Sequence, residues 1–372
     1  MAMVQFFSDW YKRYFSDPQT VLLVVLLFLG FTVIILMGDM LAPVLAAVVI
    51  AYLLEGLVRQ LERWGLGRTI AVSIVFTLFM AVVILVVMGL VPVVWQQLTQ
   101  FIEDLPRMIK QTQELLLRLP EAYPTLFSPE QVTEMTSVFT NSITDFSASI
   151  LSMSLATIAP ILTFLVYAIL GPLLVLFFLK DKTEITQYMS SLLPRDRKLL
   201  NAVWIEMDVQ IGNYVRGKVE EIVVVGGVTY LGLALFEVNY APLLAVLVGL
   251  SVIIPYIGAA VVTLPVALAA YVQFGWGADL AWIMIFYGII QALDGNLLVP
   301  LLFSEAVNLH PVAIIVAVLV FGGLWGFWGV FFAIPLATLV KAILNSWPRT
   351  SDEGITEVPH SGQQKEEVAS LP

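Results

Sequence analysis

Long apolar runs alternate with shorter polar segments along nearly the whole chain. Four stretches contain no Asp, Glu, Lys or Arg: 69–102, 146–179, 242–278 and 306–340. Because about 20 mostly apolar residues make a helix that crosses a bilayer, the pattern predicts an all-α, polytopic membrane protein. The expected transmembrane segments, eight in number, cover 20–38, 40–58, 69–91, 159–179, 221–236, 242–272, 280–301 and 312–343.

Two of these segments, 242–272 and 312–343, follow the same plan. Val-Asn-x-x-Pro introduces each of them, at 238–242 and again 69 residues later at 307–311. Each is interrupted near its middle and closed by a proline; the residues concerned are Pro255, Gly258 and Pro265 in the first, and Gly326, Gly329 and Pro335 in the second. A broken helix frees backbone groups that lipid cannot satisfy, so matching breaks in two repeats indicate hinges beside a transporter's binding site. The alternative is chance recurrence, because Gly and Pro are frequent in membrane helices.

The two repeated segments are too long for one upright crossing, at 31 and 32 residues. Each is either one tilted, kinked crossing or a re-entrant hairpin of two half-helices. The two topologies differ at loop 273–279, which is outside for hairpins and inside for full crossings. This loop has no Lys or Arg and one Asp, which favours the outside and therefore paired hairpins. With hairpins, 220–272 and 289–343 become an inverted repeat.

Basic residues set the expected orientation. Lys and Arg gather before the first span, between the second and third, and after the fourth; examples are Lys12, Arg63 and Lys182. These regions share the cytoplasmic side if each of the first four spans crosses once, and both termini are then cytoplasmic. The predicted organisation is N-terminal scaffold spans (1–91), an external helical segment (92–158), the fourth span with a cytoplasmic amphipathic helix (159–219), a repeated core (220–347) and a disordered cytoplasmic tail (348–372).

Two polar regions between the spans carry helical patterns. The external segment has a heptad seam with a second helix expected to start at Pro106 and another stripe within 132–150; the seam is Val94, Leu98, Phe101, Leu105, Met108, Thr112, Leu115 and Leu119. It is interpreted either as a self-packed cap or as a subunit contact. The stripe from Leu200 to Tyr214 predicts a separate amphipathic helix, which lies on the membrane surface or packs beneath the bundle.

Familiar enzyme and cofactor motifs fail on inspection. Residues 212–218 approach a phosphate-binding loop, but Val219 replaces the required Ser or Thr and a helical stripe runs into the segment. The chain has no cysteine, and its histidines, His310 and His360, are far apart. No basic patch indicates nucleic acid. We therefore expect no enzyme activity, no cofactor, no metal and no nucleic-acid partner.

Polar residues inside the apolar spans are the remaining candidates for chemistry. A charge at mid-bilayer costs at least about 2.5–3.5 kcal/mol, so Asp294 is expected to face protein or water, on the same helix face as Gln291 and close to Asn296. Its carboxylate is interpreted either as an ion or proton site or as a cap for a broken helix. Glu220 and Glu221 are expected to form an ion pair with Arg216 at helical spacing, and Glu55 is expected at the interface.

Several strings in the second half resemble one family, at 216–218, 254–258, 291–300, 308–311, 321–329 and 333–336. Together they are similar to the AI-2 exporter (AI-2E) family over nearly the whole chain up to Trp347. The resemblance implies a bacterial inner-membrane secondary transporter, in a family with pentameric members. Some relatives are associated with export of autoinducer-2, and others with exchange of sodium or lithium for protons.

The sequence therefore leaves three candidate functions. The first is secondary transport of a small polar solute such as autoinducer-2, the second is sodium(lithium)/proton antiport with Asp294 as the carboxylate, and the third is a non-transporting homo-oligomeric scaffold. The candidate substrate- or ion-binding residues are Asp294, Gln291, Asn296, Pro255, Tyr256, Gly258, Asn308 and His310, and the hinge candidates are Pro255, Gly258, Gly326, Gly329 and Pro335.

Overall fold

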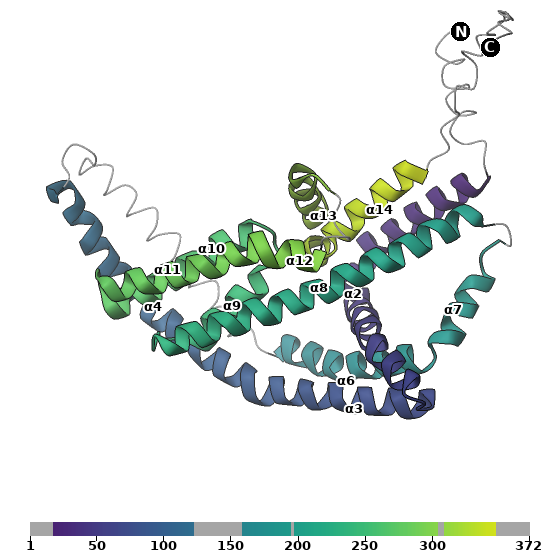
Figure 1. Ribbon diagram of the computed structural model, residues 1–372, viewed down its shortest axis with the longest axis horizontal. Coiled ribbons are helices and arrows are strands. Elements are labelled where there is room, and N and C mark those ends of the chain that lie inside the picture. Colours follow the sequence, from purple (N-terminus) through teal and green to yellow (C-terminus); the bar gives the residue numbers. More distant parts are fainter. Residues whose placement is uncertain (1–17, 123–157, 195–196, 304–308, 347–372) are drawn as a thin grey trace, which may run out of the picture.

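A computed structural model (Figure 1) describes residues 18–122, 158–194, 197–303 and 309–346, and these ranges contain helices and no strands. The predicted all-α class is confirmed for them. Among the described helices, five stretches are long and apolar enough to cross a membrane: Met40–Arg63, Arg68–Gln111, Ile257–Phe274, Ala278–Phe303 and Pro311–Phe331. The chain is therefore a multi-pass helical membrane protein. The tail 348–372 and the stripe 132–150 lie outside the described residues.

The first two predicted spans are one helix, α2 (Pro18–Arg63). Helical residues continue through Gly38 and Asp39 without a turn. Pro43 lies inside the helix and cannot donate a hydrogen bond to the carbonyl of Asp39. α2 contacts α8 (Lys198–Leu235) in its second half, where the Tyr52 hydroxyl donates to the carbonyl of Asp208. The prediction of two successive antiparallel crossings is wrong here, because a charged residue lowers hydropathy without stopping a helix.

The third predicted span also continues beyond its expected end. α3 (Arg68–Leu85), the π-helical turn η1 (Val86–Leu90) and α4 (Val91–Ala122) follow one another without a break. Pro106 was expected to start a new helix, yet α4 passes through it. Part of the heptad seam packs inside the chain. Leu105 and Met108 share a core with Tyr240, which precedes α9, and with Leu268 and Val272, which lie near the end of α10; both helices are described below.

α2, α3 and α6 (Ile158–Lys180) share a core that a buried carboxylate closes at one end. Glu55 is 7% exposed, so its side chain is covered by protein, and its expected position at the membrane interface stays a prediction. Its oxygens lie 3.4 Å from Arg59, 3.3 Å from Arg68 and 3.0 Å from Lys182 at the start of α7 (Lys182–Ser191). Arg68 also donates to the carbonyl of Leu179. This network joins the end of α2, the start of α3 and the end of α6.

The predicted amphipathic helix and fifth span form one helix, α8 (Lys198–Leu235). Val203 and Met207 on its first half pack against Ala342 of α14 (Ala333–Ser346). The amphipathic stripe is therefore covered by protein, which supports the packed alternative over the surface-bound one. Trp204, a member of the predicted stripe, remains 71% exposed.

The segment 242–272 folds as a helical hairpin, here called the first hairpin, of α9 (Ala241–Ser251) and α10 (Ile257–Phe274). Its two ends meet, because the Gln273 side chain accepts from the backbone N–H of Asn239 and donates to the carbonyl of Glu237. Its tip is tight: a Cβ at Gly258 would overlap the carbonyl oxygen of Ser251. One kinked crossing cannot bring these ends together.

The segment 312–343 forms a second hairpin from α13 (Pro311–Phe331) and α14. Its turn lies inside α13, where Trp325 has non-helical φ/ψ and Gly326 has a φ of +57°. The chain doubles back there, so Ala317 and Val318 pack against Ala333. The tip again requires glycine, because a Cβ at Gly329 would overlap the carbonyl oxygen of Phe321.

Each hairpin follows a long helix, and the two long helices run antiparallel. The first is α8, and the second consists of α11 (Ala278–Leu293), the π-helical turn η2 (Asp294–Leu298) and α12 (Val299–Phe303). Gly232 near the end of α8 abuts Phe286, whereas Gly217, earlier in α8, abuts Phe303. Figure 1 shows the two helices side by side. An antiparallel pair of this kind is compatible with the predicted inverted repeat, which stays a prediction.

Candidate functional site

A buried lysine on α8 links that helix to the tip of the first hairpin. Lys218 is 3% exposed, and its Nζ donates to Glu221 Oε2 at 2.7 Å and to the carbonyl oxygen of Val252 at 2.8 Å. Arg216, the partner expected for the glutamates, instead donates to Gly212 and Asn213. That prediction is wrong because helix rotation places Arg216 on an exposed face, although both basic residues have helical spacing to a glutamate.

The acceptor of the lysine is the negative end of a helix. Val252 is the C-cap of α9, and the last carbonyls of a helix have no partner within it. A cation at that position satisfies a carbonyl and interacts favourably with the helix dipole. Phe303 covers the ammonium group, whose Nζ lies 5.2 Å from the ring centroid. Lys218 is therefore a charged tie between α8 and the first hairpin.

One helical turn earlier, Tyr214 makes the corresponding tie to the second hairpin. Its hydroxyl donates to the carbonyl oxygen of Phe331 at 2.9 Å, and the side chain is 2% exposed. Its ring lies 5.7 Å from that of Phe303, so the same phenylalanine contacts both tying residues. Gly217 permits this approach, because a Cβ there would lie 2.9 Å from the Phe303 ring.

Asp294 faces this arrangement from the opposite helix. It begins η2, and π-helical turns occur frequently at functional sites. η2 packs against α8, which places the Asp294 carboxylate within electrostatic range of Lys218 and Glu221. Asp294 Oδ1 and Gln291 Nε2 are both buried and have no hydrogen-bond partner within the protein. Such groups are costly unless a further ligand or proton satisfies them.

The structure brings some of the predicted residues together and separates others. Asp294 and Gln291 each have a buried polar atom without a partner, whereas Asn296 is exposed and donates to the carbonyl of Ala292 in its own helix. His310 caps α13, with Nδ1 accepting from the N–H of Val312 at 3.3 Å. Asn308 lies outside the described residues. The cluster is therefore smaller than the predicted set.

The predicted hinge residues lie at or near the two hairpin tips. Gly258 and Gly329 are buried, Pro335 is buried shortly after the second tip, and Pro255 is half-buried. Tyr256 is 62% exposed and has a φ of +64°. Ile254 at the tip of the first hairpin packs against the second hairpin, at its core of Ala317, Val318 and Ala333.

Lys218 and Tyr214 were missing from the predicted site. Their signal in the sequence was a polar series at helical spacing, with Tyr214, Lys218 and Glu221 one turn apart between apolar neighbours. The described residues hold no group of three or more His, Cys, Asp or Glu side chains placed to bind a metal ion. The cluster is thus an ammonium group shared between a carboxylate and a helix end, with a second carboxylate nearby.

Comparison with known proteins gives a consistent result. The model of the AI-2E family transporter matches residues 22–349. PerM of Escherichia coli (strain K12), named as a permease, is 48% identical over 346 residues, covering 93% of this chain and 98% of that protein. YueF of Bacillus subtilis (strain 168), named as a transport protein, is 25% identical over 83% of this chain and 84% of its own. TqsA of Escherichia coli (strain K12), named as an AI-2 transport protein, is 23% identical over 86% of this chain and 91% of its own.

Proposed function

The chain belongs to the AI-2E family of transporters, and from that premise we propose that it is a secondary transporter coupled to a proton or a monovalent cation. This is a family of transporters and permeases rather than of enzymes. The proposed coupling site is the cluster of Lys218, Glu221 and Asp294, with Gln291 beside it. The observation that carries the proposal is Asp294 Oδ1, a buried carboxylate oxygen without a protein partner beside the lysine that ties down a hairpin.

Charge balance explains why one cation or proton fits the cluster. Lys218 supplies one positive charge, whereas Glu221 and Asp294 supply two negative charges when both are ionised, which leaves a net charge of −1. An unbalanced charge among apolar helices is costly. Binding one proton or one monovalent cation removes it. The unpartnered Asp294 oxygen offers an acceptor for this proton or cation.

The ties of α8 connect the coupling site to movement. With Asp294 ionised, two carboxylates compete for the Lys218 ammonium, which also holds the Val252 carbonyl. Neutralising Asp294 leaves Lys218 with Glu221 and Val252, which strengthens the tie to the first hairpin. Occupancy of the site then biases the position of that hairpin, as alternating access requires.

The proposed cargo is a small polar solute such as autoinducer-2, because TqsA is named as an AI-2 transport protein. Sodium(lithium)/proton antiport is the second candidate, and the net negative charge of the cluster favours it. The scaffold hypothesis loses support, because part of the heptad seam is already buried within the chain. Assembly into a homo-oligomer, five subunits by resemblance to the family, stays a prediction, as does placement in the bacterial inner membrane.

The fold supports the outward placement of loop 273–279. The Glu55 network gathers Arg59, Arg68 and Lys182 at one end of the molecule, and basic residues favour the cytoplasmic side. About 55 Å of helix separates Arg68 from Leu105 at 1.5 Å per residue, more than the roughly 30 Å of a bilayer core. Leu105 packs in one cluster with Tyr240 and Leu268 at the open end of the first hairpin, and we therefore propose that this end lies outside. A cysteine in place of the exposed Ala278 should react with an impermeant thiol reagent from outside.

Transport by the purified protein in proteoliposomes tests the proposal. Uptake of sodium, lithium and a labelled polar solute is measured across a pH series for the wild type and for Asp294→Asn. The variant should lose coupled transport, because it keeps the size of the side chain but not its charge. Asp279→Asn is the matched control, because Asp279 is an exposed aspartate at the start of the same helix. Wild-type transport by Asp294→Asn at every pH would remove Asp294 from the mechanism.

A further inference from the structure

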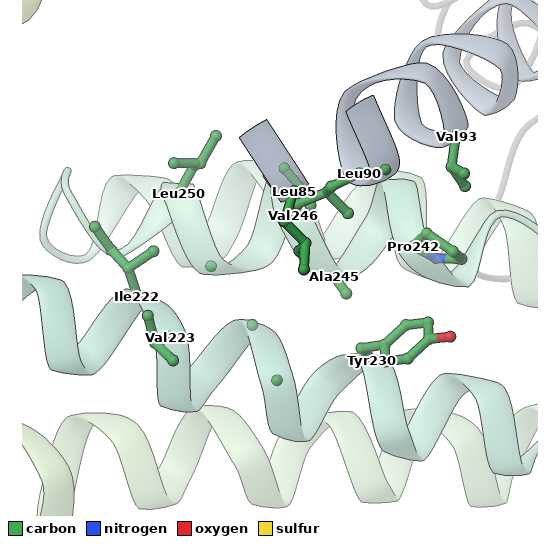
Figure 2. Close-up of a pocket in the computed structure, with 14 residues that line it drawn as sticks. Leu85, Leu90, Val93, Ile222, Val223, Tyr230, Pro242, Ala245, Val246 and Leu250 are labelled. Carbon is green, nitrogen blue, oxygen red and sulfur yellow. The ribbon is translucent and has the colours of Figure 1, made fainter. Parts of the chain in front are cut away.

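A second site lies between the first hairpin and the α3–η1–α4 helix, and none of Lys218, Glu221 and Asp294 lines it. A pocket of about 620 Å³ separates the α3–η1–α4 helix from α8 and α9. Figure 2 shows Leu85 and Leu90 reaching in from the first of these helices, Tyr230 from α8 and Val246 from α9. The volume falls within the roughly 300–1,000 Å³ of small-molecule sites.

Local backbone features keep the pocket open. On one wall, η1 widens the helix at Val86–Leu90 and presents Gly89. On the other wall, α8 presents Gly227. A Cβ built at either glycine would meet no atom within 4 Å, so both face open space. Behind them α8 and α9 cross closely, because a Cβ at Gly249 would lie 2.9 Å from the carbonyl of Ile222.

The lining is chemically uniform. It contains no charged side chain, and the Tyr230 hydroxyl is its single polar side-chain group. Its rim faces outward, because Leu85 is 70%, Val223 65% and Leu250 50% exposed. In a protein whose long apolar helices cross a membrane, apolar side chains exposed in this way face bilayer hydrocarbon. A polar solute would gain no hydrogen bonds here except at Tyr230.

We propose that this pocket binds an acyl chain of a bilayer phospholipid, wedged between the α3–η1–α4 helix and the first hairpin. The lining follows α9 from Pro242 to Leu250, which is roughly 12 Å of helix, so several carbons of a hydrocarbon chain can lie along it. Dispersion contacts with the chain would replace the packing that the two glycines leave out. Beyond these observations the inference requires only that the protein lies in a membrane, and it does not depend on the proposed coupling site.

The test uses the full-length protein in nanodiscs made with a phospholipid that carries a photoreactive diazirine in one acyl chain. Crosslinked peptides are identified and quantified by mass spectrometry. We expect labelling concentrated in 85–93, 222–230 and 242–250, compared with the lipid-facing side of α11. Gly227→Leu fills the pocket and should reduce that labelling about tenfold, equivalent to about 1.4 kcal/mol of binding.

Gly288→Leu is the matched control. Gly288 is an exposed helical glycine of α11 outside the pocket, and a Cβ there also meets no atom within 4 Å. It should leave the labelling unchanged. Gly89→Leu fills the pocket from the opposite wall, so it keeps the test decisive if Gly227→Leu fails to fold. Equal labelling in wild type and both filling variants, or labelling spread evenly over all apolar helices, would overturn the proposal. Crosslinks from the pocket to a second copy of the chain would overturn it as well.

Discussion

The two hairpins have the same arrangement of two half-helices, but different interactions hold them in place. The tip of the first is tied to α8 by an ammonium group, through Lys218 and Val252. The second is tied by a neutral hydroxyl, through Tyr214 and Phe331. Its tip is also surrounded by aromatic rings, with Trp325 and Trp328 both stacked on Phe332. A change of charge in the cluster therefore acts directly on the tie of the first hairpin and not on the neutral tie of the second.

This difference suggests separate roles for the two halves of the repeat. The strength of a charged tie depends on the ionisation of its neighbours, so the first hairpin is suited to respond to a coupling ion. An aromatic cluster contributes packing that does not change with pH. The second hairpin is suited to act as the fixed partner against which the first one moves.

The largest expected effect is at Lys218. Lys218→Gln leaves Glu221 and Asp294 buried without a cation, and removal of one partner of a buried ion pair costs about 3–5 kcal/mol. The melting temperature in nanodiscs should fall clearly, and transport should be lost. Lys198→Gln, at an exposed lysine of the same helix, should leave both unchanged. Adding Glu221→Gln to Lys218→Gln should recover part of the stability, because it removes one stranded charge; no recovery would mean that Lys218 acts mainly through Val252.

Next in size are the glycines at the two tips. Gly258→Ala and Gly329→Ala each force a Cβ into a backbone carbonyl oxygen, and overpacking of this kind costs about 1–3 kcal/mol. Gly323→Ala, where a Cβ meets no atom within 4 Å, should change little. Both tip variants should lower the melting temperature, because both tips are equally tight. A lower melting temperature for only one of the two variants would show that the other tip can move apart to accommodate the added methyl group.

The sequence predicted the tips well because their signal is local. Gly258, Gly326 and Gly329 stand at breaks in apolar runs, where backbone geometry leaves few other residues possible. Asp294 was found for a similar reason, as a lone carboxylate in an apolar segment. For these residues, the residue type and its immediate neighbours were enough to predict the local structure.

The continuity of helices through polar residues and the contacts between distant residues were harder to predict. Hydropathy falls at Asp39 and along 200–218, so α2 and α8 were each divided, although helix formation tolerates polar residues. The tie from Lys218 to Val252 joins residues 34 positions apart. Sequence spacing could not choose between Arg216 and Lys218, because small differences in rotation about the helix axis decide which one is buried.

A smaller effect is expected at Tyr214. Tyr214→Phe keeps the ring against Phe303 but removes the donor to Phe331, which costs about 0.5–1.5 kcal/mol. The loss should be the same at every pH from neutral to weakly acidic, in contrast with variants of the charged cluster. Melting temperatures over a pH series measure this, with Tyr230→Phe as the control, because Tyr230 is an exposed tyrosine of the same helix. A strong pH dependence would contradict the neutral character assigned to the second tie.

The smallest effect is expected at the open end of the first hairpin, where Tyr240 donates to the Asp104 carboxylate of α4. Burial, followed by that carboxylate, raises the pKa of Tyr240 to about 12 from its ordinary 10.0. The folded state thus favours the protonated phenol, so the stabilisation is complete below pH 10 and is lost as the pH rises towards 12. Wild type should therefore lose more stability than Tyr240→Phe between these values. Since the pair is only partly buried, the difference should stay below about 1 kcal/mol. Tyr256→Phe, at an exposed tyrosine on the tip, controls for general alkaline effects. Identical alkaline curves for wild type and Tyr240→Phe would show that this bond does not hold the open end of the first hairpin, and that packing with Leu105 and Met108 attaches it to α4.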